Sequence, residues 1–393
     1  MTTDTAGRIN GVTIGGRDSW VMYGPVFLSE PFSQKFIGKI EEYNDMPGKE
    51  QYMWENVFID EIDHFDLFIN KQSEDNVYEF ETLEELRRFD PDSCGNTQNA
   101  LIKTITNVFG AAEHDIVDIQ NLKAGMTNRS FSFSLRGNSY IFRLPGEGTG
   151  KLINRKQEAE VYKAIKQLAV SDEIIHFDAN TGYKISVFYK DAQNTSQYDS
   201  GHVRLSMEML RRIHCSGIKV AHSFAIDREI SRYNALCREN NAMRFTDNES
   251  TRIKMNILIE YIKSLDIPEV LCHVDSNPDN FIRLADGSFR LVDWEYSGMG
   301  DPVMDISMYA IYSYFSKEET DELLAVYLAR RPVKEETARL YAYCALGGYL
   351  WALWTEYKQS LGVEFGEYGM KMYRYAKEYF KRFQDLFSPQ INN

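Results

Sequence analysis

The chain has 393 residues, of which 43% are hydrophobic and 26% charged, and its formal net charge is −14. That length exceeds one usual domain, and the composition suits a globular protein with a sizeable core. The negative charge excludes wide contact with nucleic acid or an anionic membrane, because both need a basic surface.

Cysteine usage and the length of the apolar segments indicate the cellular compartment. The five cysteines are scattered, odd in number and without CxxC spacing, which favours a reducing cytosol over a disulfide frame or a zinc site. The first residues, MTTDTAGRIN, hold no apolar signal segment. The most apolar late run, residues 341–354, is too short to cross a bilayer. We therefore expect a cytoplasmic protein without membrane insertion.

The first elements in chain order predict a small module of their own. Residues 1–92 alternate turn signals with short apolar runs such as WVMYGPVFLS and WENVFIDEI, which predicts a small α/β module. The stretch DPDSCGNTQN, residues 90–99, is dense in turn formers and predicts a linker. A short helix is expected at residues 100–110.

The next segment predicts a β-rich lobe over residues 93–190. The runs IVDIQNL, RSFSFSLRG and SYIFRLPG are separated by the turn signals AGMTN and RGN, which predicts antiparallel hairpins. An amphipathic helix follows at residues 154–169 with Asn154 as its N-cap, and then two short strands around IIHFD and YKISVFY. Residues 191–393 are mostly helical, broken by a hairpin within 271–294, and a small-molecule site is expected in the cleft between the two lobes.

The stretch LCHVDSNPDNFIRLADGSFRLVDWEY, residues 271–296, carries the chemistry. His273, Asp275 and Asn280 have the spacing H-x-D-x-x-x-x-N, and Asp293 follows an apolar strand thirteen residues later. Phosphoryl transfer needs a carboxylate to take the acceptor's proton, which suits Asp275, and oxygen ligands for Mg²⁺, which suit Asn280 and Asp293. The alternative is a set of turn-capping polar residues, but the full spacing favours a phosphotransferase.

These residues resemble the catalytic loop and metal-binding strand end of protein-kinase-like phosphotransferases. The segments VDWEYSGMGDPVMDIS, AGMTNRSF, YIFRLPGEGTGKLINRKQE and GGYLWALW are similar to the choline/ethanolamine kinase family, in particular its bacterial choline kinases, over residues 100–390. The resemblance implies an α+β, two-lobed protein-kinase-like fold, with a small β-rich lobe and a large helical lobe. It also implies ATP- and Mg²⁺-dependent phosphorylation of choline to phosphocholine.

The resemblance also places the nucleotide site. In the turn AGMTN, Gly125 allows backbone N–H groups to approach the phosphates, and Thr127 and Asn128 offer side-chain donors; a plain hairpin turn is the alternative. Arg143, in the next strand, suits phosphate oxygens. Glu158, on the following helix, is its expected ion-pair partner, unless it is an ordinary surface residue.

The acceptor pocket is expected to be aromatic. Trp351 and Trp354 share one face of a predicted helix, and Glu295 and Tyr296 follow the metal strand. A quaternary ammonium is best held by aromatic faces with a carboxylate near. The alternative is an aromatic stripe in a helical core. Lesser expectations are pocket roles for Tyr309 and Tyr312, loop support by His214, and braces for the loop after Asp293 by Asp301 and Asp305.

Residues 1–92 resemble the C-terminal part of a sugar or phosphocholine nucleotidyltransferase, but no Gly-rich nucleotide loop is present. Cytidylyl transfer is therefore not expected. The module is interpreted as a docking or dimerisation unit, which allows a homo-oligomer, or as part of a fused nucleotidyltransferase–kinase. For the kinase, the alternative acceptors are ethanolamine, an aminoglycoside and thiamine. A non-catalytic scaffold is disfavoured by the intact Asp275, Asn280 and Asp293.

Overall fold

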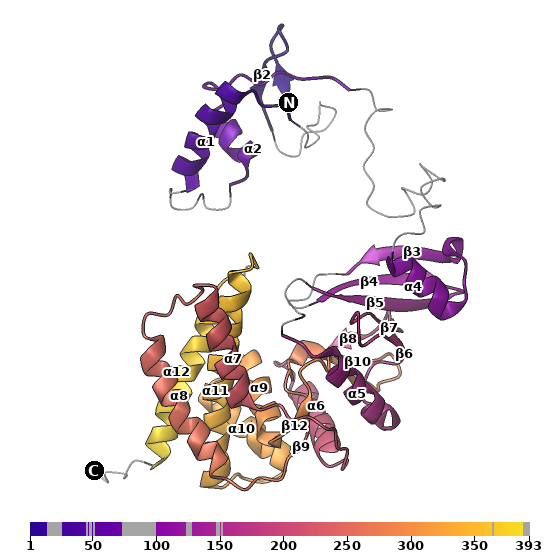
Figure 1. The fold of residues 1–393 in the computed structure, drawn as a ribbon, viewed down its shortest axis with the longest axis vertical. Helices are drawn as coiled ribbons and strands as arrows, with labels where there is room; N and C mark the ends of the chain where they lie inside the picture. Colours follow the sequence, from indigo (N-terminus) through magenta and orange to yellow (C-terminus); the bar gives the residue numbers. More distant parts are fainter. Residues whose placement is uncertain are drawn as a thin grey trace. The chain divides into compact units, whose positions relative to one another are not determined.

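The computed structural model describes residues 1–13, 26–44, 46, 49, 52–72, 100–122, 128–146, 150, 152–363 and 365–387. The chain divides into two compact units, Met1–Glu81 and Thr82–Asn393 (Figure 1). The predicted linker at 90–99 and the predicted domain boundary at residue 92 lie outside the described residues, so that boundary stays a prediction.

The first unit is a small mixed α/β module, as expected from its sequence. A two-stranded antiparallel sheet pairs β1 (Thr2–Thr3) with β2 (Ile9–Gly11), and two helices follow, α1 (Glu30–Asn44) and α2 (Trp54–Asp60). Most of the run WVMYGPVFLS lies outside the described residues. The unit has its own apolar core: Ile9, Phe36, Tyr43, Val57, Phe58, Phe65 and Leu67.

The second unit begins with a sheet lobe. Its antiparallel sheet has the order β3-β4-β5-β7-β6, which confirms the predicted hairpins. Alternating apolar residues of the sheet pack against the helix at residues 100–109, where Ile102 and Ile105 are buried three residues apart. The elements of the lobe are α4 (Ala100–Phe109), β3 (Ile116–Asn121), β4 (Asn128–Leu135), β5 (Asn138–Pro145), α5 (Arg155–Ile165), β6 (Ile174–Phe177) and β7 (Lys184–Val187).

Helix α5 is fixed at its start by a side-chain cap. The Asn154 side chain accepts hydrogen bonds from the backbone N–H groups of Lys156 and Gln157, which confirms the predicted N-cap. The helix ends at Ile165 and continues as one 3₁₀ turn, so it is shorter than expected. This cap sets where Glu158 lies relative to the sheet.

The helical lobe follows (Figure 1), and it supplies most of the largest apolar core among the described residues. The fold is therefore α+β with a sheet lobe and a helical lobe, as predicted. No helix in the described part of the chain is long and apolar enough to cross a membrane, and the cysteines described there are free thiols. The helices are α6 (Ser200–His214), α7 (Ile226–Glu239), α8 (Asn248–Lys263), α9 (Pro302–Tyr312), α10 (Lys317–Leu328), α11 (Lys334–Gln359) and α12 (Tyr368–Phe387).

Helix α11 is the axis of this lobe. It packs against α7, α8, α9 and α12, and its residues 340–358 are all buried. Two adjacent glycines allow the close approach. A Cβ on Gly347 would lie 2.9 Å from the sulfur of Met308 on α9, and one on Gly348 would lie 2.6 Å from the backbone oxygen of Met372 on α12. The GGYLWALW segment is thus a packing seam as well as the carrier of the two tryptophans.

Two small sheets carry the loops of the site. The predicted hairpin is present as β10 (Phe281–Arg283) and β11 (Phe289–Leu291), with the short β8 (Gln193–Asn194) added at its edge. Strand β9 (Val270–Cys272) pairs instead with β12 (Gly298–Gly300), a strand that the sequence did not predict. The chain therefore leaves β9 into the loop of Asp275, and leaves β11 into the segment of Asp293.

Candidate active site

The loop after β9 holds Asp275 and Asn280 together. The Asn280 Nδ2 group donates to the Asp275 backbone oxygen at 2.8 Å and to its carboxylate Oδ2 at 3.1 Å. These bonds fix the amide with its oxygen turned away from Asp275. Val274, just before Asp275, has a φ of 70°, a left-handed conformation that a β-branched residue rarely adopts. Such strain persists only where the surroundings fix the backbone, as they do here.

Asp305, on α9, is what fixes this loop. Its carboxylate accepts the backbone N–H groups of His273 at 2.8 Å and Val274 at 2.7 Å, and it contacts His214 Nε2 at 3.0 Å. The expected support role of His214 is therefore seen through Asp305. The brace acts on the loop before Asp275, whereas we had expected it on the segment after Asp293. Asp301 instead caps α9, where its Oδ1 accepts from the Val303 N–H.

The pKa of Asp275 is raised to about 7, chiefly by burial; hydrogen bonds from Tyr312 and Asn280 oppose the shift, and the charges of Asp293 and Glu295 add to it. A carboxylate with a pKa near neutrality can take a proton from an alcohol better than an ordinary aspartate can. The position and protonation of Asp275 both suit a general base.

Asp293 lies where the chain leaves β11. Its φ is 63°, again left-handed, and its side chain is 39% exposed. His273 holds this segment from the other loop, because its Nε2 lies 2.9 Å from the Val292 backbone oxygen. Burial lowers the pKa of His273, so the ring is neutral and Nε2 donates this bond. The loop of Asp275 and the segment of Asp293 are thereby held together.

Arg143 reaches Asp293 from the sheet lobe. Its Nη1 lies 2.6 Å from Glu158 Oε1 and 3.6 Å from Asp293 Oδ1, so the expected Arg143–Glu158 ion pair is present. Burial would raise the pKa of Glu158, but Arg143 and the other neighbouring cations outweigh it and lower that pKa, which keeps the carboxylate charged. The Nε and Nη2 atoms of Arg143 are buried without a hydrogen-bond partner. Unused guanidinium donors beside an exposed carboxylate suit a phosphate and its metal ion.

A second arginine, which the sequence reasoning missed, joins this network. Arg155 Nη1 lies 2.7 Å from Glu158 Oε2 and 3.0 Å from Glu295 Oε2, and its Nη2 donates to Asn128 Oδ1 at 3.0 Å. Asn128 Nδ2 donates in turn to Glu295 at 2.8 Å. The structure thus places Glu295 among the arginines, and its predicted role beside the substrate cation stays a prediction.

The predicted phosphate-covering turn is described only at its end. Gly125 and Thr127 lie outside the described residues. Asn128 begins β4, and both ends of its amide bond to Arg155 and Glu295. These contacts favour a positioning role for Asn128, in addition to its predicted role as a hydrogen-bond donor to the nucleotide phosphates.

The predicted acceptor aromatics come together on α11 and its neighbours. The Trp351 ring centroid lies 5.4 Å from that of Tyr296 and 6.1 Å from that of Trp354, and Phe365 lies 5.0 Å from Trp354. Both tryptophans are only 3% exposed. Trp351 Nε1 donates to the sulfur of Met308, and the Trp354 side chain is within hydrogen-bonding reach of Tyr296. The group is part of the core and at the same time faces the loop of Asp275.

Tyr312 lies between the aromatic cluster and Asp275. Its ring centroid lies 5.9 Å from that of Trp351, and its hydroxyl group is within hydrogen-bonding reach of Asp275. Tyr368, at the start of α12, is within hydrogen-bonding reach of Tyr312. The sequence did not identify Tyr368 as a site residue. Tyr312 therefore connects the aromatic cluster to the carboxylate of Asp275.

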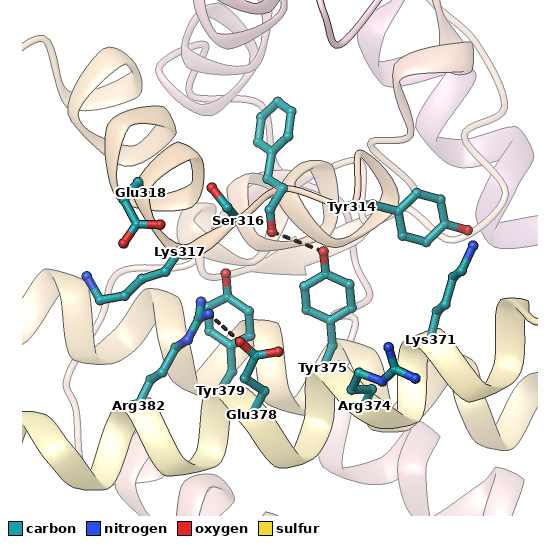
Figure 2. A pocket seen from close by; sticks show the side chains of 11 residues that line it. Tyr314, Ser316, Lys317, Glu318, Lys371, Arg374, Tyr375, Glu378, Tyr379 and Arg382 are labelled. Carbon is teal, nitrogen blue, oxygen red and sulfur yellow. Dashed lines mark hydrogen bonds and ion pairs between the residues drawn. The ribbon is translucent and has the colours of Figure 1, made fainter.

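A separate pocket of about 460 Å³ lies between the α9–α10 junction and α12 (Figure 2). Its cations are largely matched: Lys317 pairs with Asp321, Lys371 with Glu367, and Arg382 with Glu378. It contains none of the predicted site residues. Its lining residues are Tyr314, Phe315, Ser316, Lys317, Glu318, Lys371, Arg374, Tyr375, Glu378, Tyr379 and Arg382.

A sheet lobe joined to a helical lobe, with a buried Arg143–Glu158 pair whose arginine lies 3.6 Å from Asp293, defines a kinase-like phosphotransferase. The model of the phosphotransferase enzyme family matches residues 118–343. The chain belongs to that family, and it is an enzyme that transfers phosphoryl groups.

Several known proteins are similar to this chain. Protein LicA of Haemophilus influenzae is 26% identical over 260 residues, which is 63% of this chain and 75% of that protein. The crystal structure of choline kinase LicA from Streptococcus pneumoniae is 28% identical, covers 73% of this chain and 99% of its own, and has a TM-score of 0.64. A choline/ethanolamine kinase family protein from Mesorhizobium loti has 25% identity, covers 70% of this chain and 90% of its own, and has a TM-score of 0.56.

Proposed function

We propose that this chain is a choline kinase, which transfers the γ-phosphoryl group of ATP to the hydroxyl group of choline and releases phosphocholine and ADP. The observation that carries the proposal is Asp275, a carboxylate of raised pKa beside the cluster of Tyr296, Tyr312, Trp351 and Trp354. The similarity to a choline kinase that covers 99% of that protein supports the same acceptor.

Asn280 and Asp293 are proposed to hold Mg²⁺. Their oxygens are the hard ligands that this ion prefers, and the hydrogen bonds of Asn280 Nδ2 turn its amide oxygen away from Asp275. When bound, the ion would neutralise charge that develops on the transferring phosphates. Arg143 supplies unused donors from the opposite lobe, and Glu158 orients it.

Asp275 is proposed to take the proton of the alcohol as its oxygen attacks phosphorus. Choline carries its quaternary nitrogen two carbons from the hydroxyl group, so the cation lies within a few bonds of the base. Aromatic faces bind such a cation without needing hydrogen bonds from it. Ethanolamine is the second candidate acceptor, but its ammonium group has three donors to satisfy, and the described side chains around Trp351 and Trp354 are mostly aromatic.

A panel of acceptors tests the proposal. We expect ADP release with choline to exceed that with ethanolamine, an aminoglycoside or thiamine at equal concentration, and phosphocholine to form in equal amount to ADP. Preference for any other alcohol would replace the acceptor while leaving the enzyme class intact.

Replacing Asp293 with alanine should lower kcat/KM for Mg²⁺–ATP by at least about a hundredfold, because a catalytic metal supplies several kcal/mol of transition-state stabilisation. Asn280→Ala should act in the same direction with a smaller effect. A Mg²⁺ titration of ADP release provides the measurement. Asp279→Asn is the matched control, since Asp279 is an exposed carboxylate of the same loop. An Asp293→Ala enzyme with unchanged Mg²⁺ dependence would refute the metal assignment.

A further inference from the structure

Two arginines share two glutamates between the lobes. Arg143 and Arg155 come from the sheet lobe, as does Glu158, while Glu295 belongs to the helical lobe. All four side chains are less than 10% exposed. Each arginine contacts both glutamates, but not equally: Arg155 lies 3.0 Å from Glu295, whereas Arg143 lies 3.9 Å from it. The formal charges of this group cancel.

Arg155 is the member that spans the lobes most closely. It bonds within its own helix to Glu158, across to Glu295, and to Asn128, the last residue of the predicted phosphate-covering turn. Its side chain is confined from behind, because a Cβ on Gly182 would lie 3.1 Å from its Nε. Gly182 has a φ of 74°, so the turn that packs there favours glycine. The guanidinium group is thereby held in one place.

Without Arg155, Glu295 would be a buried carboxylate whose remaining cation is Arg143. An uncompensated charge in a buried site is costly, so Glu295 would attract Arg143 away from Asp293 and the phosphates. Glu295 would also add a negative charge close to where the nucleotide phosphates are proposed to lie.

We infer that Arg155 is a positioning residue for the nucleotide: it neutralises Glu295 and holds Asn128, which leaves the free donors of Arg143 for phosphate. This inference rests on the proposed ATP site but not on the identity of the acceptor. Arg155 is not proposed to touch the reacting atoms. Its effect is expected on nucleotide affinity first, and on the acceptor hardly at all.

The test is Arg155→Met in the full chain, with KM for ATP, KM for choline and the affinity for Mg²⁺–ADP measured by calorimetry. We expect KM for ATP and the Mg²⁺–ADP dissociation constant to rise at least about tenfold, because removing one partner of a buried charge pair leaves the other unpaired. KM for choline should stay near its original value. Adding Glu295→Gln to Arg155→Met should recover part of the lost affinity, since it removes the uncompensated charge. Arg155→Lys keeps the charge but not the two-pronged guanidinium group. Its Mg²⁺–ADP dissociation constant should lie between those of the wild type and Arg155→Met.

Arg204→Met is the matched control, because Arg204 pairs with Glu208 on the exposed face of α6. The inference is overturned if Arg155→Met leaves Mg²⁺–ADP affinity unchanged, if both KM values rise equally with a lower melting temperature, or if Glu295→Gln gives no recovery. Calorimetry needs no acceptor. A wild-type enzyme that binds Mg²⁺–ADP but does not phosphorylate choline would therefore refute the proposed acceptor and leave this inference open to the same measurement.

Discussion

Replacing Asp275 with asparagine is expected to lower turnover by about 10²–10⁴-fold, the usual contribution of a general base. The substitution keeps the size of the side chain, and the bond from Asn280 Nδ2 to the backbone oxygen of residue 275 does not need the carboxylate. In the unmodified enzyme, kcat/KM should fall as the pH drops below about 7, where Asp275 gains its proton. ADP release across a pH series measures both effects.

Stability provides the control for this variant. The pKa of Asp275 is higher in the folded protein than in the unfolded chain, so the folded state holds more protons between about pH 4 and 7. Stability is therefore lost as the pH rises through this window. Above it, the ionised Asp275 lowers the free energy of unfolding. Asp275→Asn should have an equal or higher melting temperature at pH 8. Full activity in this folded variant would show that another group accepts the proton.

Trp354→Ala is expected to raise KM for choline by about thirtyfold, since a desolvated cation–π contact contributes on the order of 2 kcal/mol. KM for ATP should change little, because Trp354 lies on α11 and packs against Trp351 and Phe365, not beside Arg143. Ethanolamine should lose less, so the preference between the two alcohols should narrow. The KM values for the three substrates are the measurement.

The burial of Trp354 calls for a matched variant, because cutting a large core side chain to alanine costs about 3–5 kcal/mol of stability. Tyr349 lies on the same helix, is equally buried, and bonds to Asn234 and Asn248 away from the cluster. Tyr349→Ala should lower the melting temperature and leave the ratio of choline KM to ATP KM unchanged. If both variants change that ratio alike, Trp354 is a core residue only.

Spacing predicted much of the site, because its key residues lie close together in the sequence. Asp275, Asn280 and Asp293 flank short apolar strands, and that pattern can be recognised in a single sequence. Glu295 was expected beside the aromatic residues because it follows the metal strand, supplies a negative charge and fits the family resemblance. Glu295 and Tyr296 lie in a turn between β11 and β12, however, and Glu295 bonds toward Arg155.

Other features depend on contacts between distant segments. Arg155 opens an amphipathic helix and reads as a surface residue, yet it is buried against Glu295, 140 positions away. Strand β12 was missed because GMG has little strand propensity, and its pairing with β9 supplies what its sequence lacks. Asp305 was linked to the nearest loop in the sequence, whereas the fold brings it under a loop some thirty residues earlier. The likeness of residues 1–92 to a nucleotidyltransferase stays a prediction.

The glycine pair of α11 has a consequence for how the acceptor preference of this enzyme can diverge. One helix presents Trp351 and Trp354 and also makes the tightest contacts with α9 and α12 through Gly347 and Gly348. A lineage that exchanged the tryptophans for smaller side chains would at once open voids along that seam. Compensating changes would then be required on both neighbouring helices. The two tryptophans are thus coupled to the packing of α11 against α9 and α12. Substitutions at Tyr312 or Tyr368, which lie at helix ends, would change the acceptor preference with less disturbance of that packing.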